Sequence, residues 1–249
     1  MHNLNSTEIR IAIVIPSYRE DTALPTLLRQ LSKKLTIEDA IIIVDDSPAP
    51  ESAIIERKCK EATESSGAQF HFISCGIKSG RGHAIRRGMI FAMNCFEHLE
   101  FIIECDADGS HTVTDIIRLR DSKIQAHLLI GSRYLAGSQI IGWPISRRVF
   151  SLLLNKMIPK LLSINITDIT NGLRRYSTIA TSNILDVPQE NIGFIYLTEQ
   201  AIILNEAKLN YAEVPVTFIN RTEGKSTVTI LEIFRSMQGI HKLIKKSRR

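Results

Sequence analysis

Short apolar runs alternate with segments of helical period over the first half of this 249-residue chain. The runs that predict strands are 9–16, 40–46, 69–75, 100–109 and 126–133. The segments that predict helices lie near 22–35, 51–65, 82–97 and 113–124. Strands that are separated by helices favour a parallel sheet with helices on both faces. The predicted fold class is therefore α/β, with a mostly parallel central sheet.

The second half of the chain departs from this alternation after residue 135. Residues 146–163 read as a very apolar helix that is interrupted at Pro159. The other elements expected there are helices near 178–185 and 194–206, a strand at 209–220 and a last helix near 228–245. No repeat, low-complexity segment or linker divides the chain. We therefore expect one domain over residues 1–249, with a front half at about 9–134 and a back half at about 135–249.

The composition, with 44% hydrophobic and 23% charged residues, is that of an ordinary globular protein. The longest stretches without a charged side chain have 13 residues, whereas a membrane-spanning helix needs about 20 apolar residues. The start of the chain lacks a basic segment followed by an apolar one, so we expect no secretory signal. The four cysteines lie too far apart for a redox or zinc motif. These features predict a cytoplasmic protein with reduced thiols.

The net charge of +5 is concentrated at the C-terminal end of the sequence. Residues 242–249 hold five Lys and Arg and no acid, whereas the remaining residues have 26 basic and 26 acidic side chains. A nucleic-acid-binding protein usually spreads positive charge over a face, so we expect no nucleic-acid partner. A short basic segment suits an anionic membrane surface, although a solvated terminus explains it equally well. The apolar helix at 146–163, with Trp143 beside it, suits a membrane interface as well as a buried position.

Pairs of carboxylates follow two of the predicted strands. Asp106 and Asp108 come after the apolar run that begins at 100, and Asp45 and Asp46 end the run at 40–46. In open parallel sheets, ligands bind at the carboxyl ends of the strands. Carboxylates together with substrate phosphates are the usual ligands of Mg²⁺ or Mn²⁺. Asp106 and Asp108 are therefore predicted to hold such an ion at a departing diphosphate, the alternative being that they only cap the next helix.

A glycine-rich basic loop at 78–88 leads into a predicted helix, and its Lys78 and Gly82 suit a phosphate at a helix N-terminus. The loop is not a dinucleotide fingerprint, because Ile85 stands at the third glycine position. The GKST at 224–227 is not a phosphate-binding P-loop, because Ile219 stands where the first glycine is required. Both exclusions count against hydride transfer and ATP hydrolysis.

The order of these motifs resembles that of the family-2 inverting nucleotide-sugar glycosyltransferases, and among them the dolichol- and polyprenyl-phosphate mannose synthases. The matching stretches, colinear over nearly the whole chain, are VIPSYRED (14–21), IIIVDDS (41–47), KSGRGHAIRRG (78–88), CDADGSH (105–111), GSRYLAGSQIIGWPISRR (131–148), DITNGLRRY (168–176) and EVPVTFINRTEGKS (213–226). The resemblance implies a GT-A type nucleotide-sugar-binding fold, with a nucleotide-binding front half and an acceptor- and membrane-facing back half. Three stretches depart from the family pattern, namely DDSPAPES (45–52), Gly109-Ser110 and GKST (224–227).

The resemblance also implies roles for individual residues. Those expected at the nucleotide sugar are Pro16, Tyr18, Glu20, Asp45, Asp46, Lys78, Gly82 and Asp106. Asp106 and Asp108 would hold Mg²⁺ or Mn²⁺ and the diphosphate, Asp108 being counted with the catalytic residues. The other residues expected to be catalytic are Arg133, Arg147 and Arg221, which would face the acceptor phosphate.

The resulting hypothesis is a metal-dependent, inverting sugar transfer from a nucleotide diphosphate to a polyprenyl phosphate, by a protein bound peripherally at the cytoplasmic membrane surface. A phosphomonoester is largely dianionic at pH 7, so this acceptor would need cations to position it and no general base. One alternative is transfer to a sugar hydroxyl in polysaccharide or glycolipid synthesis, which would need a carboxylate base such as Glu199. Another is a catalytically silent scaffold with the same fold, against which the presence of both Asp106 and Asp108 argues.

Overall fold

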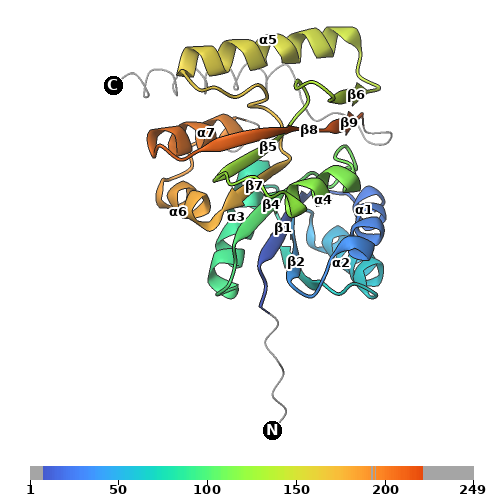
Figure 1. The fold of residues 1–249 in the computed structure, drawn as a ribbon. Coiled ribbons are helices and arrows are strands. Elements are labelled where there is room, and N and C mark those ends of the chain that lie inside the picture. Colours follow the sequence, from blue (N-terminus) through green and yellow to red (C-terminus); the bar gives the residue numbers. More distant parts are fainter. Residues whose placement is uncertain (1–7, 192, 194, 221–249) are drawn as a thin grey trace.

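The computed structural model describes residues 8–191, 193 and 195–220. Its central feature is a seven-stranded sheet with the strand order β3-β2-β1-β4-β7-β5-β8 (Figure 1). The strands are β1 (Ile11–Ser17), β2 (Asp39–Asp45), β3 (Gln69–Ser74), β4 (Phe101–Glu104), β5 (Leu128–Ser132), β7 (Arg174–Ser177) and β8 (Tyr211–Pro215). A second, two-stranded sheet pairs β6 (Gln139–Ile141) with β9 (Thr217–Ile219). The helices are α1 (Ala23–Leu31), the 3-10 turn η1 (Ser32–Lys34), α2 (Ala49–Thr63), α3 (Arg81–Cys95), α4 (Val113–Asp121), α5 (Ile145–Leu162), α6 (Thr178–Asp186) and α7 (Tyr196–Glu206).

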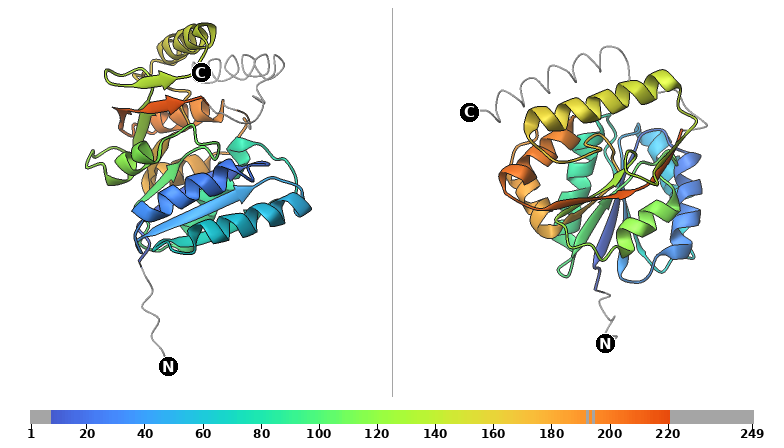
Figure 2. Two further views of the ribbon diagram at one scale, coloured as in Figure 1. Left: turned by 90° about the vertical axis from the view of Figure 1, so that its right-hand side faces the viewer. Right: turned by 45° about the horizontal axis from the view of Figure 1, so that its top comes forward.

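Helices cover both faces of the large sheet, as Figure 2 shows from two further sides. Side chains alternate between the two faces along each strand, and the central strands are apolar on both. In β1, Ile13 and Ile15 pack with apolar residues of α1, α2 and α4. Ala12 and Val14 pack with apolar residues of α3, α6 and α7 on the other face. The predicted α/β class with a mostly parallel sheet is confirmed, because β1, β2, β3 and β4 pair in parallel, as do β5 and β8.

Strand β7 is antiparallel and lies between β4 and β5, and the sequence did not predict it. Its residues include Arg174 and Arg175, which are both buried, so the segment lacks the apolar pattern of a central strand. The Arg174 guanidinium donates to the backbone carbonyls of Ile169, Asn171 and Leu197. The Arg175 guanidinium donates through Nη1 and Nη2 to those of Leu119, Ser122 and Ile124, while its Nε has no hydrogen-bond partner among the described residues. The helices and loops around β7 supply these acceptors, which allows the strand to bury two arginines.

Two predicted elements of the back half differ from the structure. The helix expected to be interrupted at Pro159 continues through it to Leu162, because Pro159 lies in the last turn and Ser163 (φ 55°) ends the helix in a left-handed conformation. The strand expected at 209–220 is two strands, since β8 ends at Pro215 in the large sheet and β9 belongs to the small one. The short strand β6 was also not predicted. The helix expected near 228–245 lies outside the described residues.

Candidate functional site

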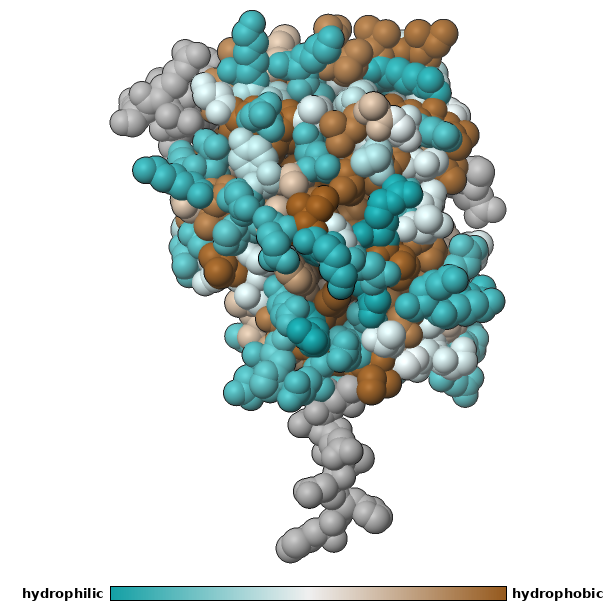
Figure 3. All heavy atoms as spheres, in the orientation of Figure 1, coloured by the Kyte–Doolittle hydropathy of each residue, from teal (hydrophilic) through white to brown (hydrophobic). Residues whose placement is uncertain are grey.

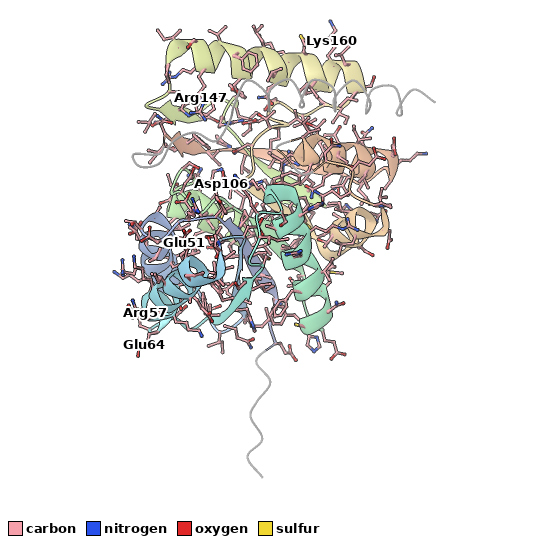
Figure 4. The ribbon with its side chains drawn as sticks, turned by 180° about the vertical axis from the view of Figure 1, so that it is seen from behind. Glu51, Arg57, Glu64, Asp106, Arg147 and Lys160 are labelled. Carbon is pink, nitrogen blue, oxygen red and sulfur yellow. The ribbon has the colours of Figure 1, made fainter. Side chains whose placement is uncertain are left out.

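The carboxyl ends of β1, β2 and β4 lie side by side at one edge of the large sheet. The strand order places β1 between β2 and β4, and the register pairs Ser17 with Asp45. Asp106 follows the end of β4 by two residues. In the view of Figure 4, Asp106 lies between Glu51 of α2 and Arg147 of α5. The predicted acids are therefore together at the sheet edge, where the front and back halves meet.

Asp45 has a buried carboxylate with one oxygen engaged. Its Oδ1 accepts a hydrogen bond from Ser47 Oγ at 2.9 Å, and Ser47 Oγ accepts one from the backbone N–H of Arg19 at 2.8 Å. Its Oδ2 is buried and has no hydrogen-bond partner among the described residues, and the same holds for Ser17 Oγ beside it. An unsatisfied buried acceptor is costly, so such an oxygen at a strand end suits a donor group of a ligand.

Asp46 instead holds the loop that precedes α3. Its carboxylate accepts hydrogen bonds from the backbone N–H groups of Ser79 (2.8 Å) and Gly80 (3.0 Å) and from Ser79 Oγ. Gly80 has a φ of 97°, a conformation that favours glycine. Lys78 Nζ lies 4.6 Å from the centre of the Tyr18 ring, which fixes the loop to the segment after β1. The predicted contact of Asp46 with a ribose stays a prediction.

The other residues expected at the nucleotide sugar surround the same edge. Pro16 is half-buried in β1, and Glu20 follows in the turn after it. Gly82 lies in the first turn of α3, where a Cβ would come 2.3 Å from Gln189 Nε2 and 2.9 Å from Tyr196 Cγ. Packing therefore explains this glycine without a ligand, and its predicted contact with the nucleotide sugar stays a prediction.

Asp106 and Asp108 occupy the turn after β4. Asp108 Oδ1 accepts a hydrogen bond from the backbone N–H of Ser110 at 3.0 Å. The backbone N–H of Asp106 donates to His111 Nδ1 at 3.0 Å, which places the proton of a neutral ring on Nε2. His111 Nε2 in turn lies 3.1 Å from Asn171 Oδ1. The turn is thus ordered by its own backbone and by a buried histidine.

This pair of carboxylates fits a hard divalent cation. Within the described part of the chain no group of three or more His, Cys, Asp and Glu side chains could hold a metal ion. Mg²⁺ commonly binds one or two carboxylates and takes its remaining ligands from substrate phosphates and water, so two acids are a sufficient protein donor set. Asp106 and Asp108 would be the ligands, and the ion would supply charge neutralisation at a diphosphate.

A buried ion-pair cluster lies directly behind Asp106, and the sequence did not predict it. Arg81 donates through Nε to Asp106 Oδ1 at 2.8 Å and through Nη1 to Glu104 Oε1. Glu104 also accepts from the hydroxyls of Tyr176 and Tyr196. Burial raises the pKa of Glu104 above its ordinary value, and the positive charge of Arg81 opposes this shift. The sequence signal that could have revealed the cluster is Glu104, the one acid in the otherwise apolar strand β4. A buried carboxylate needs a cation beside it, so a basic partner was to be expected.

Arg133, expected at an acceptor phosphate, is held in a buried ion pair. Its Nε donates to Asp168 Oδ2 and its Nη2 to Asp168 Oδ1, both at 2.7 Å, and Nη2 also lies 2.7 Å from Thr170 Oγ1. Burial acts to lower the pKa of Arg133, but the Asp168 carboxylate raises it above its ordinary value. The guanidinium is therefore permanently charged and fixed in position.

Trp143 brings Arg133 and Arg147 together. The guanidinium carbon of Arg147 lies 4.0 Å from the centre of a Trp143 ring and that of Arg133 lies 5.2 Å from it. Arg147 Nη1 also donates to Asn220 Oδ1 at 3.1 Å. Two of the three arginines expected at the acceptor are thus neighbours, and the third, Arg221, lies outside the described residues.

Glu199, the candidate general base for a hydroxyl acceptor, is buried with both oxygens engaged. Its Oε1 accepts from the backbone N–H of Glu190 at 2.9 Å, and its Oε2 accepts from the backbone N–H and the side-chain amide of Asn191, both at 3.1 Å. These contacts fix the loop before α7. Both oxygens of Glu199 are therefore committed to holding this loop.

Comparison with protein families matches residues 12–184 to Glycosyl transferase family 2. The chain belongs to this family. It is a glycosyltransferase with a GT-A type fold, so the resemblance seen in its motifs is confirmed.

Curated relatives and solved structures extend over most of the chain. The undecaprenyl-phosphate mannosyltransferase of Micrococcus luteus is 28% identical, covering 89% of this chain and 88% of the relative. The polyprenol monophosphomannose synthase of Mycolicibacterium smegmatis is 29% identical, covering 92% and 84%. The glucosyl-3-phosphoglycerate synthase of Mycobacterium tuberculosis, solved with Mn²⁺ and UDP, superposes with a TM-score of 0.61 at 16% identity, covering 96% of this chain and 80% of that one. The structural likeness shows the fold alone.

Proposed function

We propose that this glycosyltransferase moves a sugar from a nucleotide-diphosphate sugar to a polyprenyl phosphate, with inversion and with Mg²⁺ or Mn²⁺. The observation that carries the proposal is the adjacency of an acidic and a basic cluster. The His111 ring lies 5.5 Å from Phe218, and Phe218 lies 5.2 Å from Trp143, both edge to face. These rings join the Asp106 turn to Arg133 and its neighbours. The names of two relatives support a polyprenyl-phosphate acceptor.

The donor would lie at the acidic cluster, on the side of the aromatic rings where Asp106 is. The Oδ2 of Asp45, which has no hydrogen-bond partner in the described part of the chain, suits an N–H or O–H group of a nucleoside. Asp106 and Asp108 suit a cation at its diphosphate. The Mn²⁺ and UDP in the solved synthase of the same fold support this assignment. Pro16, Tyr18, Glu20, Lys78 and Gly82 would complete the pocket around these acids.

The acceptor would lie at the basic cluster, on the side of the aromatic rings where Arg133 is. Its phosphate would approach Arg133, Arg147 and Arg221, which would neutralise and orient it through charge-assisted hydrogen bonds. One oxygen of the phosphate would attack the anomeric carbon in a single displacement as the nucleotide diphosphate departs. Because the phosphate is already largely dianionic at pH 7, no side chain needs to take up a proton. The engagement of both Glu199 oxygens supports this choice over a hydroxyl acceptor.

The outer helix α5 would bring the protein to the cytoplasmic face of an anionic membrane. This helix lies at the margin of the molecule (Figures 1 and 2), and apolar residues gather near it on the surface in Figure 3. Ile145 is 80% exposed, and Leu153 and Met157 are each 55% exposed, while Lys156 and Lys160 supply positive charge. Such a helix suits the interface between lipid tails and headgroups. No helix within the described ranges is long and apolar enough to cross a membrane.

Transfer assays with labelled nucleotide sugars test the proposal. The purified protein is incubated with undecaprenyl phosphate or dolichyl phosphate in vesicles and with a panel of GDP- and UDP-sugars, with Mn²⁺ or with EDTA. We expect a metal-dependent, acid-labile lipid-linked sugar whose anomeric configuration is opposite to that of the donor. A product in which the sugar is joined to a hydroxyl, or full transfer in EDTA, would contradict the proposal. The Asp108→Asn variant serves as the inactive control.

A further inference from the structure

Arg81 is the first residue of α3, and its side chain turns inward to the sheet. Its guanidinium lies between the carboxylates of Glu104 and Asp106, with Nη2 2.6 Å from Asp106 Oδ1. The Arg81 side chain is 15% exposed, that of Glu104 is 0% exposed and that of Asp106 is 23% exposed. A basic residue of the loop expected to bind phosphate is thus committed to the first acid of the D-x-D pair.

The place of this guanidinium is set from several sides. A Cβ at Gly172 would lie 2.4 Å from Arg81 Nη2, so the glycine leaves room for it. The Tyr196 ring lies 5.4 Å from the guanidinium carbon. The Tyr176 hydroxyl donates to Glu104 Oε2 at 3.0 Å and lies 2.8 Å from Gln200 Oε1. The partners of Glu104 therefore orient Glu104, which in turn orients Arg81.

We propose that Arg81 is a positioning residue that holds Asp106 in the orientation required for binding the metal and the diphosphate. The inference rests on the proposed function, because it assigns Asp106 to that site. A buried ion pair is weak evidence for stability, since desolvation of the charges offsets their attraction. The effect of this ion pair is instead to fix the orientation of the Asp106 carboxylate. Arg81 holds Oδ1, and Oδ2 lies 3.7 Å from His111 Nε2. Partners that hold a metal ligand in this way typically change metal affinity by about 10- to 100-fold when they are removed.

Variants that keep the net charge of the cluster separate positioning from two other roles. If Arg81 acted only through its charge, Mn²⁺ affinity would be nearly unchanged in such variants, because the net charge beside Asp106 stays the same. If it acted only on the fold, the folded protein would bind Mn²⁺ unchanged and only its melting temperature would fall. If it positions Asp106, Mn²⁺ binding weakens although the net charge of the cluster is kept.

Three variants test these outcomes. Arg81→Lys keeps the charge but not the fork that spans two carboxylates. Arg81→Met with Glu104→Gln removes one charge of each sign, so that no unpaired buried charge prevents folding. Arg86→Lys is the matched control, because Arg86 is also on α3 and is also part-buried, but its guanidinium binds the backbone carbonyls of α6 and the residue after it.

The measurements are Mn²⁺ titrations followed by electron paramagnetic resonance, with Mn²⁺ alone and with GDP or UDP, together with melting temperatures and the kcat and KM for the donor. We expect Mn²⁺ binding to weaken roughly 10-fold or more in the first two variants, with kcat falling more than the donor KM changes. In Arg86→Lys, Mn²⁺ affinity should be unchanged. Unchanged or tighter binding in both Arg81 variants would overturn the inference alone. Failure of the unaltered protein to bind Mn²⁺ under any condition would overturn the metal-dependent function as well.

Discussion

Replacing Asp168 by Asn should strongly destabilise the fold, because it leaves the Arg133 guanidinium buried beside a neutral amide. In the parent structure, Asp168 accepts from the backbone N–H and two guanidinium nitrogens of Arg133 at 2.7 to 2.9 Å. The side chains are 6% and 0% exposed. Removing one partner of such a pair typically costs about 3–5 kcal/mol. For a chain of this length that corresponds to a fall in melting temperature of roughly 6–20 °C.

Urea unfolding followed by circular dichroism measures this effect, with Glu56→Gln as the control. Glu56 pairs with Lys60 on the exposed surface of α2, so its replacement should change stability by less than about 1 kcal/mol. The paired variant Arg133→Met with Asp168→Asn removes the buried charge and should recover most of the lost stability. It should nevertheless fail to use the lipid acceptor while still binding the nucleotide sugar. A loss below about 1 kcal/mol in Asp168→Asn would refute the reasoning.

Three further predictions follow from the proposed site. Asp106→Asn or Asp108→Asn should abolish most transfer with the circular dichroism spectrum unchanged, and addition of EDTA should do the same to the parent; activity that survives all three treatments would exclude the metal. Deletion of residues 242–249, which lie outside the described residues, should release much of the protein from anionic vesicles in a sedimentation assay and leave the remaining binding only weakly dependent on salt, whereas unchanged partitioning would show that the tail is not involved. Arg147→Ala should weaken acceptor binding by about 1.5–3 kcal/mol, which is measured as a higher acceptor KM. Glu199→Gln should change the rate of the folded enzyme little. A loss of rate of about 10²–10⁴-fold in Glu199→Gln would instead indicate a hydroxyl acceptor.

The parts of the site that could be predicted are those that follow apolar strands. Asp45 ends a run of buried aliphatic residues and Asp106 follows another, and the geometry of a parallel sheet then brings them to one edge. Apolar runs of this kind identify strands without reference to the rest of the fold. The same reasoning failed for β7, because the backbone carbonyls that accept from the buried Arg174 and Arg175 come from distant parts of the chain, among them α4 and α7.

The partners of the polar side chains could not be predicted from spacing. Asp46 follows Asp45 directly, yet it turns to Ser79 and Gly80, which are more than thirty positions away. Arg81 belongs to a basic loop that suits phosphate, yet it turns to buried acids. Such partners depend on which long-range hydrogen bonds leave the fewest buried groups unsatisfied, and that is a property of the whole fold.

The position of Arg133 shows how several distant segments determine one side chain. Glu213 of β8 accepts from the backbone N–H groups of Thr167 and Asp168, which places the Asp168 carboxylate against Arg133. From the other side, Asn155 of α5 donates to Thr170 Oγ1 at 2.9 Å, and that hydroxyl lies 2.7 Å from Arg133 Nη2. Asn155 is the one buried polar side chain among the described residues of α5, and Thr170 links it to the arginine proposed to bind the acceptor. The same helix exposes apolar residues on its outer side. In the proposed function, the surface that meets the lipid and the cation that binds its phosphate are thus parts of one connected structure.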